Sequence, residues 1–158
     1  MFKKIFFWTP SRSCLGFCFR FWHFFSFYFF LAVIFLLNLW WVASNNYPQL
    51  FCFWKIMLFS EAIHQAGKFF SPWPRPYLKS GAKVPKSIFG YSKGSFPSGH
   101  ALRAVIIFYF LAQINVSIAW ILAPGLFLSV FSRLVFSLHY PVDIVGGFSI
   151  GLLLINFC

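Results

Sequence analysis

The sequence predicts an all-α fold: a multi-pass transmembrane helix bundle of about five to six spans. Of 158 residues, 60% are hydrophobic and only 9% are charged. The apolar residues form runs long enough to cross a bilayer as helices, and no run has the strict alternation of a membrane β-barrel strand. A soluble domain of this size could not bury so much apolar surface, so we expect lipid to be the main solvent.

The chain is divided into a short leading segment and one domain. Residues 1–20 are basic and aromatic, and no small-residue cleavage site follows them, so we interpret them as an interfacial segment and not as a signal peptide. Residues 21–158 form the predicted transmembrane domain. Its first span is expected at 21–42, where Trp40 and Trp41 suit the interfacial belt.

The second predicted span, 49–66, follows a turn at 44–48 and is the most polar of the spans. Glu61 and His64 lie three residues apart and can share one face of a helix. A di-metal site needs more carboxylates than the two acidic residues of this chain. We therefore expect a local pair within the bundle and not a pair of metal ligands.

A long loop at 67–97 is rich in proline, glycine, serine and lysine, and we predict that it is the active-site loop. Three further apolar helices are expected at 98–115, 116–138 and 141–158. The fourth span contains Pro124-Gly125, which predicts a kink. The last carries Gly147 and Gly151, a small-residue face for close helix packing.

Polar residues recur where predicted spans meet on one side of the membrane. Counting spans places the loop, the segment 97–100 and the segment 132–143 on that side. Arg133, His139 and Asp143 stand there among apolar residues, and ionisable groups in such sequence are functional candidates. Because His139 and Asp143 are four apart, the carboxylate can hold one imidazole nitrogen and leave the other free.

The residue types in these stretches favour binding of a phosphate group. Lys68 and Arg75 are cations, and Ser98 and Gly99 open a helix, whose unpaired N–H groups attract anions. Positive charge beside a single carboxylate suits phosphate and not a metal cation, so we expect no metal and no cofactor. The net charge of +11 is carried by bases that flank apolar runs, which favours anionic lipid over nucleic acid.

These positions resemble the three-part signature of the type 2 phosphatidic acid phosphatase family. The resemblance covers residues 68–143, and it is carried by Lys68-x6-Arg75-Pro76, Pro97-Ser98-Gly99-His100 and Ser132-Arg133-x5-His139-x3-Asp143. It is specific for the family and says little about the substrate. The family usually has six spans, whereas we count five and an interfacial start.

The resemblance implies a catalytic role for each matched residue. His139 would attack phosphorus and form a phosphohistidine, and Asp143 would orient its ring. His100 would protonate the leaving oxygen and then activate water. The phosphate would be bound by Lys68, Arg75, Ser98, Gly99 and Arg133.

The predicted function is therefore a metal-independent integral-membrane lipid phosphatase that acts on a phosphomonoester or diphosphate of a lipid head group. One alternative is a phosphotransferase, in which a second lipid captures the phosphohistidine. Another is a catalytically silent lipid-binding protein of the same fold. A vanadium haloperoxidase shares the signature but is usually soluble, which this composition disfavours.

Several residues outside the signature receive a structural interpretation. His23 and His64 match no motif and are expected to be structural. Arg103 could join the phosphate site or pair with Glu61. Four lysines are expected to form a basic face near lipid head groups: Lys79, Lys83, Lys86 and Lys93. The four cysteines show no metal or redox spacing, so we expect apolar fillers and no disulfide.

The orientation of the site has two conflicting indications. Basic residues crowd the active-site side, and the tendency of positive charge to stay in the cytoplasm would put the site there. The family resemblance implies the outer face. We follow the resemblance and expect a bacterial inner-membrane protein whose site faces the periplasm.

Overall fold

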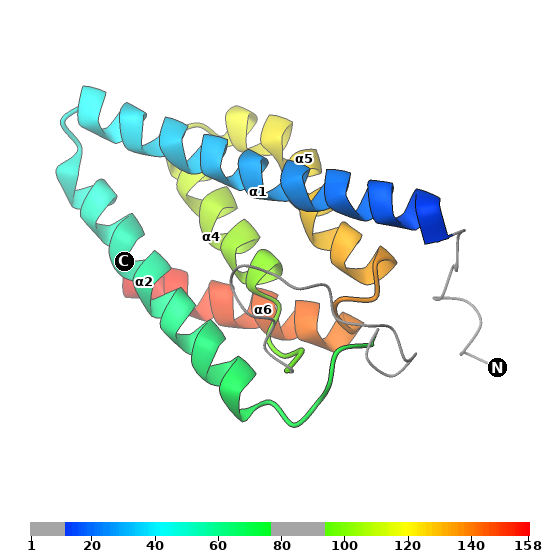
Figure 1. Ribbon diagram of the computed structural model, residues 1–158. Coiled ribbons are helices and arrows are strands. Elements are labelled where there is room, and N and C mark those ends of the chain that lie inside the picture. The colour runs from blue at the N-terminus through cyan, green and yellow to red at the C-terminus, as the bar shows by residue number, and fades with distance from the viewer. Residues whose placement is uncertain (1–11, 77–93) are drawn as a thin grey trace.

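The computed structural model describes residues 12–76 and 94–158, with side chains from residue 21 onward. These residues form a bundle of helices, and the only β pairing among them is an isolated bridge between Pro74 and Gly94. In chain order (Figure 1), the elements are α1 (Arg12–Ala43), α2 (Tyr47–Phe70), α4 (Gly99–Ile114), α5 (Val116–Val135), α6 (Pro141–Leu154) and the 3-10 turn η1 (Ile155–Phe157).

The all-helical prediction is confirmed for the described part of the chain, whereas the number of spans is not. Two stretches, Phe21–Ala43 and Val116–Val135, are long and apolar enough to cross a membrane. Two more, Gly99–Ile114 and Pro141–Phe157, are apolar but shorter. A count of five to six spans therefore stays a prediction.

Several predicted boundaries differ from the observed ones; the fourth span, for example, ends at Val135 and not at 138. Helix α1 already begins at Arg12, inside the predicted interfacial segment. Helix α2 continues to Phe70, so Lys68 lies in a helical last turn and not in a loop that starts at 67. Ser71 is extended, because the residue before a proline is pushed out of the helical region. The four loop lysines, all within 77–93, lie outside the described residues.

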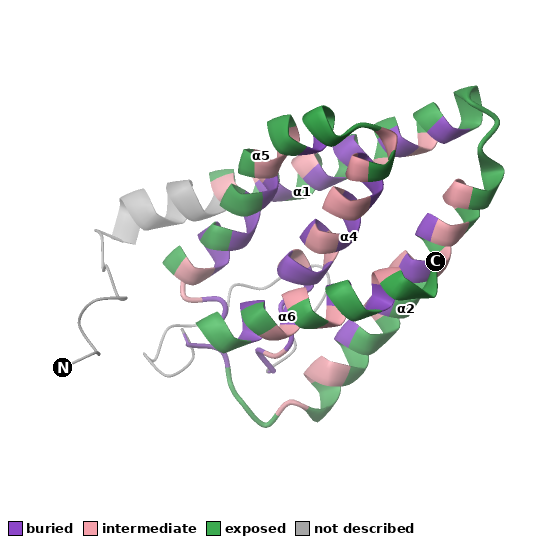
Figure 2. Cartoon of the chain, turned by 180° about the vertical axis from the view of Figure 1, so that it is seen from behind, coloured by how far each residue is buried: buried purple, intermediate pink, exposed green. Residues whose placement is uncertain are grey.

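Helix α4 is the central element of the bundle, since it contacts α1, α2, α5 and α6. Beside it, Trp41, Phe53 and Phe110 form a buried aromatic cluster with ring centroids 5.2–5.6 Å apart. Figure 2 shows the buried residues on the inward faces of the helices and exposed residues on the outward faces. Many exposed side chains are large and apolar, as on a surface that faces lipid.

The glycines of α6 allow close contact with α4. A Cβ atom at Gly147 would lie 2.5 Å from the carbonyl oxygen of Ser98, and one at Gly151 would lie 3.1 Å from that of Leu102. The small-residue face predicted for the last helix is confirmed. Pro124 lies inside α5, which continues through it to Val135.

The cysteine prediction is wrong for one pair. Cys52 and Cys158 form a disulfide, with Cα atoms 6.0 Å apart, a normal separation for such a bond. They are 106 residues apart in sequence, so no local spacing could reveal the pair. The fold brings the start of α2 to the end of the chain, where Lys55 Nζ also donates to the carbonyl oxygen of Phe157 at 3.0 Å.

Candidate active site

A cavity of about 130 Å³ lies where α2 ends, α4 begins and α5 leads into α6. Its wall includes all four histidines of the chain. The lining residues are His23, His64, Lys68, Arg75, Gly99, His100, Arg103, Arg133, Leu138 and His139.

Most of the residues singled out in the sequence meet at this cavity. The two histidines of the predicted reaction, His100 and His139, share its wall with three predicted phosphate ligands, Lys68, Arg75 and Arg133. Gly99 also lines it, whereas Ser98 and Asp143 are fully buried next to lining residues. The separate motifs therefore form one site, and the chemical role of each residue stays a prediction.

Asp143 is held behind His139 by the start of α6. Its Oδ2 accepts a hydrogen bond from the backbone N–H of Tyr140 at 2.7 Å, which closes a capping box. Ser95 Oγ donates to Oδ1 at 3.4 Å. The same Oδ2 lies 3.5 Å from His139 Nδ1. Because Nδ1 faces the carboxylate, Nε2 is the ring nitrogen left for the cavity.

Burial determines the protonation state of His139. The pKa of His139 is lowered to about 4. Burial is the largest cause, contact with Asp143 opposes the shift, and the charge of Arg75 adds to it. His139 is therefore neutral at neutral pH. A neutral imidazole with a free lone pair on Nε2 is the form that can attack phosphorus.

The start of α4 also lines the cavity, through Gly99 and His100. The backbone N–H of Ser98 donates to the carbonyl oxygen of Asp143 at 2.9 Å, which ties the start of α4 to α6. Gly99 and His100 follow in the first helical turn, where backbone N–H groups have no partner within the helix. Such groups, with the positive end of the helix dipole, favour an anion.

Two buried arginines add positive charge. Arg75 is 5% exposed and donates from Nη1 to the carbonyl oxygen of Leu138 at 3.4 Å, beside His139. Arg133 is 4% exposed and donates from Nε to the carbonyl oxygen of Ser129 at 3.4 Å. Buried cations are costly without a counter-charge, and the chain has only two acidic residues. Both positive charges would stabilise an anion bound in the cavity.

Two lining side chains were not assigned to the site from the sequence, and a third, Arg103, was left between two alternatives. His64 was expected to be structural, but it lies one helical turn before Lys68, and that spacing could have revealed it. His23, also expected to be structural, reaches the cavity from α1. Arg103 combines both expected alternatives, since it pairs with Glu61 and also lines the cavity.

The described residues contain no group of three or more His, Cys, Asp or Glu side chains placed to hold a metal ion. The arrangement they do form is a cationic pocket whose wall includes the imidazoles of His100 and His139. That arrangement can bind a phosphate group and offer both a nucleophile and a proton donor.

Comparison with protein families gives one match. A family model described as PAP2 superfamily matches residues 49–158, which run from the first turn of α2 through α6 and exclude all of α1. Comparisons with curated proteins and with solved structures find no match.

Proposed function

This chain belongs to the PAP2 superfamily, and from that premise we propose that it is a metal-independent, multi-pass membrane lipid phosphatase. Membership supports phosphatase-type activity, and the lipid substrate and the mechanism are our proposal. The observation that carries the proposal is the meeting of His139, His100 and the cationic side chains at one cavity. The substrate is a phosphomonoester or diphosphate on a lipid head group.

In the first step, Nε2 of His139 attacks phosphorus and the bond from phosphorus to the lipid oxygen breaks. His100 donates a proton to the leaving oxygen. In the second step, His100 takes a proton from water, the water oxygen attacks phosphorus, and the phosphorus–nitrogen bond breaks to release phosphate. Asp143 orients His139 throughout and stabilises its positive charge.

The cationic side chains supply most of the remaining stabilisation of the transition state. Lys68, Arg75 and Arg133 neutralise the phosphate oxygens, and Ser98 and the backbone at Gly99 bind them at the start of α4. Preorganised donors around developing charge are a large source of rate enhancement. Because these groups carry the charge, the proposed reaction needs no metal ion.

The exposed apolar surface supports a lipid substrate. The cavity lies at one end of the bundle, whose outer faces carry many large apolar side chains. A lipid could place its phosphate in the cavity and its tail along the helices. We propose five spans in a bacterial inner membrane, with this end in the periplasm.

The test is phosphate release by the purified full-length protein from a panel of phosphorylated lipids, with excess chelator present. We expect release that survives the chelator, and an acid-labile phosphoprotein that His139→Ala does not form. Release by His139→Ala at the unsubstituted rate would refute the assignment. Transfer of label to an added lipid would identify a phosphotransferase. Turnover absent across the panel would indicate a silent lipid-binding protein.

A further inference from the structure

His64 is a buried imidazole that the proposed reaction does not use. Its side chain lines the cavity, and the residue is only 5% exposed. Nδ1 lies 3.4 Å from Oε1 of Glu61, while Nε2 is buried and has no hydrogen-bond partner among the described residues. An unpaired buried nitrogen in the wall of an anion pocket requires an explanation.

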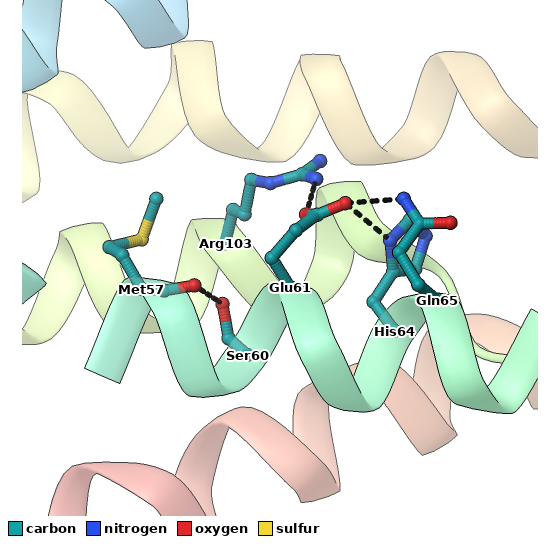
Figure 3. Close-up of polar contacts among 6 residues, drawn as sticks. All are labelled: Met57, Ser60, Glu61, His64, Gln65 and Arg103. Carbon is teal, nitrogen blue, oxygen red and sulfur yellow. Dashed lines mark hydrogen bonds and ion pairs between the residues drawn. The ribbon is translucent and has the colours of Figure 1, made fainter. Parts of the chain in front are cut away.

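Glu61 determines which nitrogen of His64 carries the proton. Its carboxylate lies between two sets of donors (Figure 3): Oε2 pairs with Arg103, and Oε1 accepts from Gln65 at 2.5 Å and faces His64. A carboxylate only accepts hydrogen bonds, so Nδ1 of His64 must be the donor. Nε2 is then left with a lone pair and no hydrogen.

Nε2 lies where α4 begins. A Cβ atom on Gly99 would be 2.6 Å from Nε2, so the imidazole occupies the space that a side chain would take. The first-turn N–H groups of α4 start at the same place. A phosphate bound at this helix start would therefore be close to Nε2.

The other groups that face the cavity disfavour a proton on His64 while no anion is present. Four cations surround the space: Lys68 from α2, Arg75 from the loop, Arg103 from α4 and Arg133 from α5. The remaining titratable groups of the wall are the imidazoles of His23, His100 and His139. A second proton on His64 would add positive charge to this set, and bound phosphate would offset it.

The dianion of a phosphomonoester and an unprotonated Nε2 are both hydrogen-bond acceptors. They repel unless a proton lies between them, whether it resides on nitrogen or on oxygen. We propose that His64 is a further phosphate-binding residue, and that the cavity binds phosphate together with one proton held between Nε2 and a phosphate oxygen. This inference rests on the phosphate site of the proposed function and adds a residue and a proton to it.

The test counts protons when phenylphosphonate binds to the full-length protein in detergent, because its dianion has no P–O–H of its own and no ester bond that the protein could hydrolyse. Calorimetry at about pH 8, in buffers of different ionisation enthalpy, gives the number of protons taken up per bound phosphonate. His64→Gln replaces Nε2 by an amide N–H that donates without an added proton. We expect this variant to take up about one proton fewer per bound anion than the unsubstituted protein. Each fall of one pH unit should therefore strengthen anion binding by the variant about tenfold less than it strengthens binding by the unsubstituted protein.

Gln65→Ala is the matched control, because Gln65 contacts the same Glu61 oxygen but is exposed and does not line the cavity. It should keep the unsubstituted proton count. His64→Asn repeats the test if His64→Gln does not fold, as judged by thermal melting.

Each outcome of the proton count decides the inference. An unchanged count in the His64 variants, in a protein that binds the phosphonate and releases phosphate from lipid, would overturn the inference and leave the proposed function intact. If the unsubstituted protein releases phosphate from lipid but does not bind the phosphonate, the inference is overturned; if it also releases no phosphate, the proposed function is overturned with it.

Discussion

At the scale of single residues, the chemistry depends on polar side chains held in a mostly apolar protein. Asp143 is fully buried and its oxygens accept hydrogen bonds from Tyr140 and Ser95, so its position is determined by several contacts. The position of the His139 ring depends in turn on Asp143, because Nδ1 of His139 lies 3.5 Å from Oδ2 of Asp143. A buried charge without such partners would be strongly destabilising. The same contacts that make the carboxylate tolerable also orient the proposed nucleophile.

The two histidines of the reaction should respond differently to removal. His139→Ala should lower phosphate release by about 10⁴-fold or more with every substrate, because no nucleophile remains. His100→Ala should cost about 10²–10⁴-fold with a lipid phosphate. It should cost less with p-nitrophenyl phosphate, whose leaving oxygen needs no proton.

Steady-state rates on both substrates, with thermal melting as the folding control, check this prediction. Equal losses on the two substrates in His100→Ala would argue against a proton-donor role for this residue.

The protonation of His139 predicts how the first step depends on pH. Its pKa is lowered from the usual 6.5 to about 4, so the attacking neutral form persists well below the pH at which an ordinary histidine protonates. Protonation removes the lone pair, and the rate should therefore fall only as the pH falls through about 4.

Single-turnover release of p-nitrophenol isolates the attack on phosphorus from later steps. A midpoint near 6.5 in that profile would contradict the assignment of a buried, neutral His139. Melting curves over the same pH range separate loss of the nucleophile from unfolding.

At the scale of elements, α6 both positions the site and packs the bundle. Its first turn carries Asp143, and its glycine face lets α4 approach closely. The carbonyl oxygen nearest to Gly147 belongs to Ser98, the N-cap of α4. Helix packing and the geometry of the proposed phosphate site therefore depend on the same contact.

Gly147→Ala should destabilise the protein by about 1–3 kcal/mol, the usual cost of overpacking a tight contact. The added Cβ would lie 2.5 Å from the Ser98 oxygen, so α4 or α6 must shift. Thermal or denaturant unfolding in detergent measures the change. Ser149→Ala, at an exposed position of the same helix, is the control and should change stability by less than about 0.5 kcal/mol. Equal stability of the two variants would show that α6 does not need the small residue.

At the scale of the whole molecule, the site is assembled from every helix region that reaches one end of the bundle. The family match begins at residue 49, yet α1 contributes His23 to the cavity, and Phe30 packs edge-on against His100 with ring centroids 5.6 Å apart. The opposite end holds the α1–α2 turn and the Cys52–Cys158 disulfide. The two ends of the bundle therefore differ in charge and in chemistry.

Labelling in intact bacterial cells with a membrane-impermeant maleimide tests the orientation. In a chain with Cys14 and Cys18 changed to serine, Phe70→Cys marks the end with the cavity and Ser44→Cys the opposite end. If the site faces the periplasm, Phe70→Cys should be labelled in intact cells. Ser44→Cys should be labelled only after the membrane is opened.

The reverse labelling pattern would place the site in the cytoplasm. The basic residues near the cavity favour that orientation. A disulfide at the opposite end favours it as well, since disulfides persist in oxidising compartments.

The helical class, the approximate helix limits and the motif residues follow from the sequence alone, because apolar periodicity and short spacings act along one helix. Lys68 and His64, or His139 and Asp143, are neighbours through helical geometry alone. The packing of the helices decided which side chains from different helices share a cavity: His23 from α1, His64 beside Gly99, and Arg103 between Glu61 and the cavity. It also decided the pairing of Cys52 with Cys158. These contacts depend on how helices far apart in sequence pack together, and no local pattern encodes that packing.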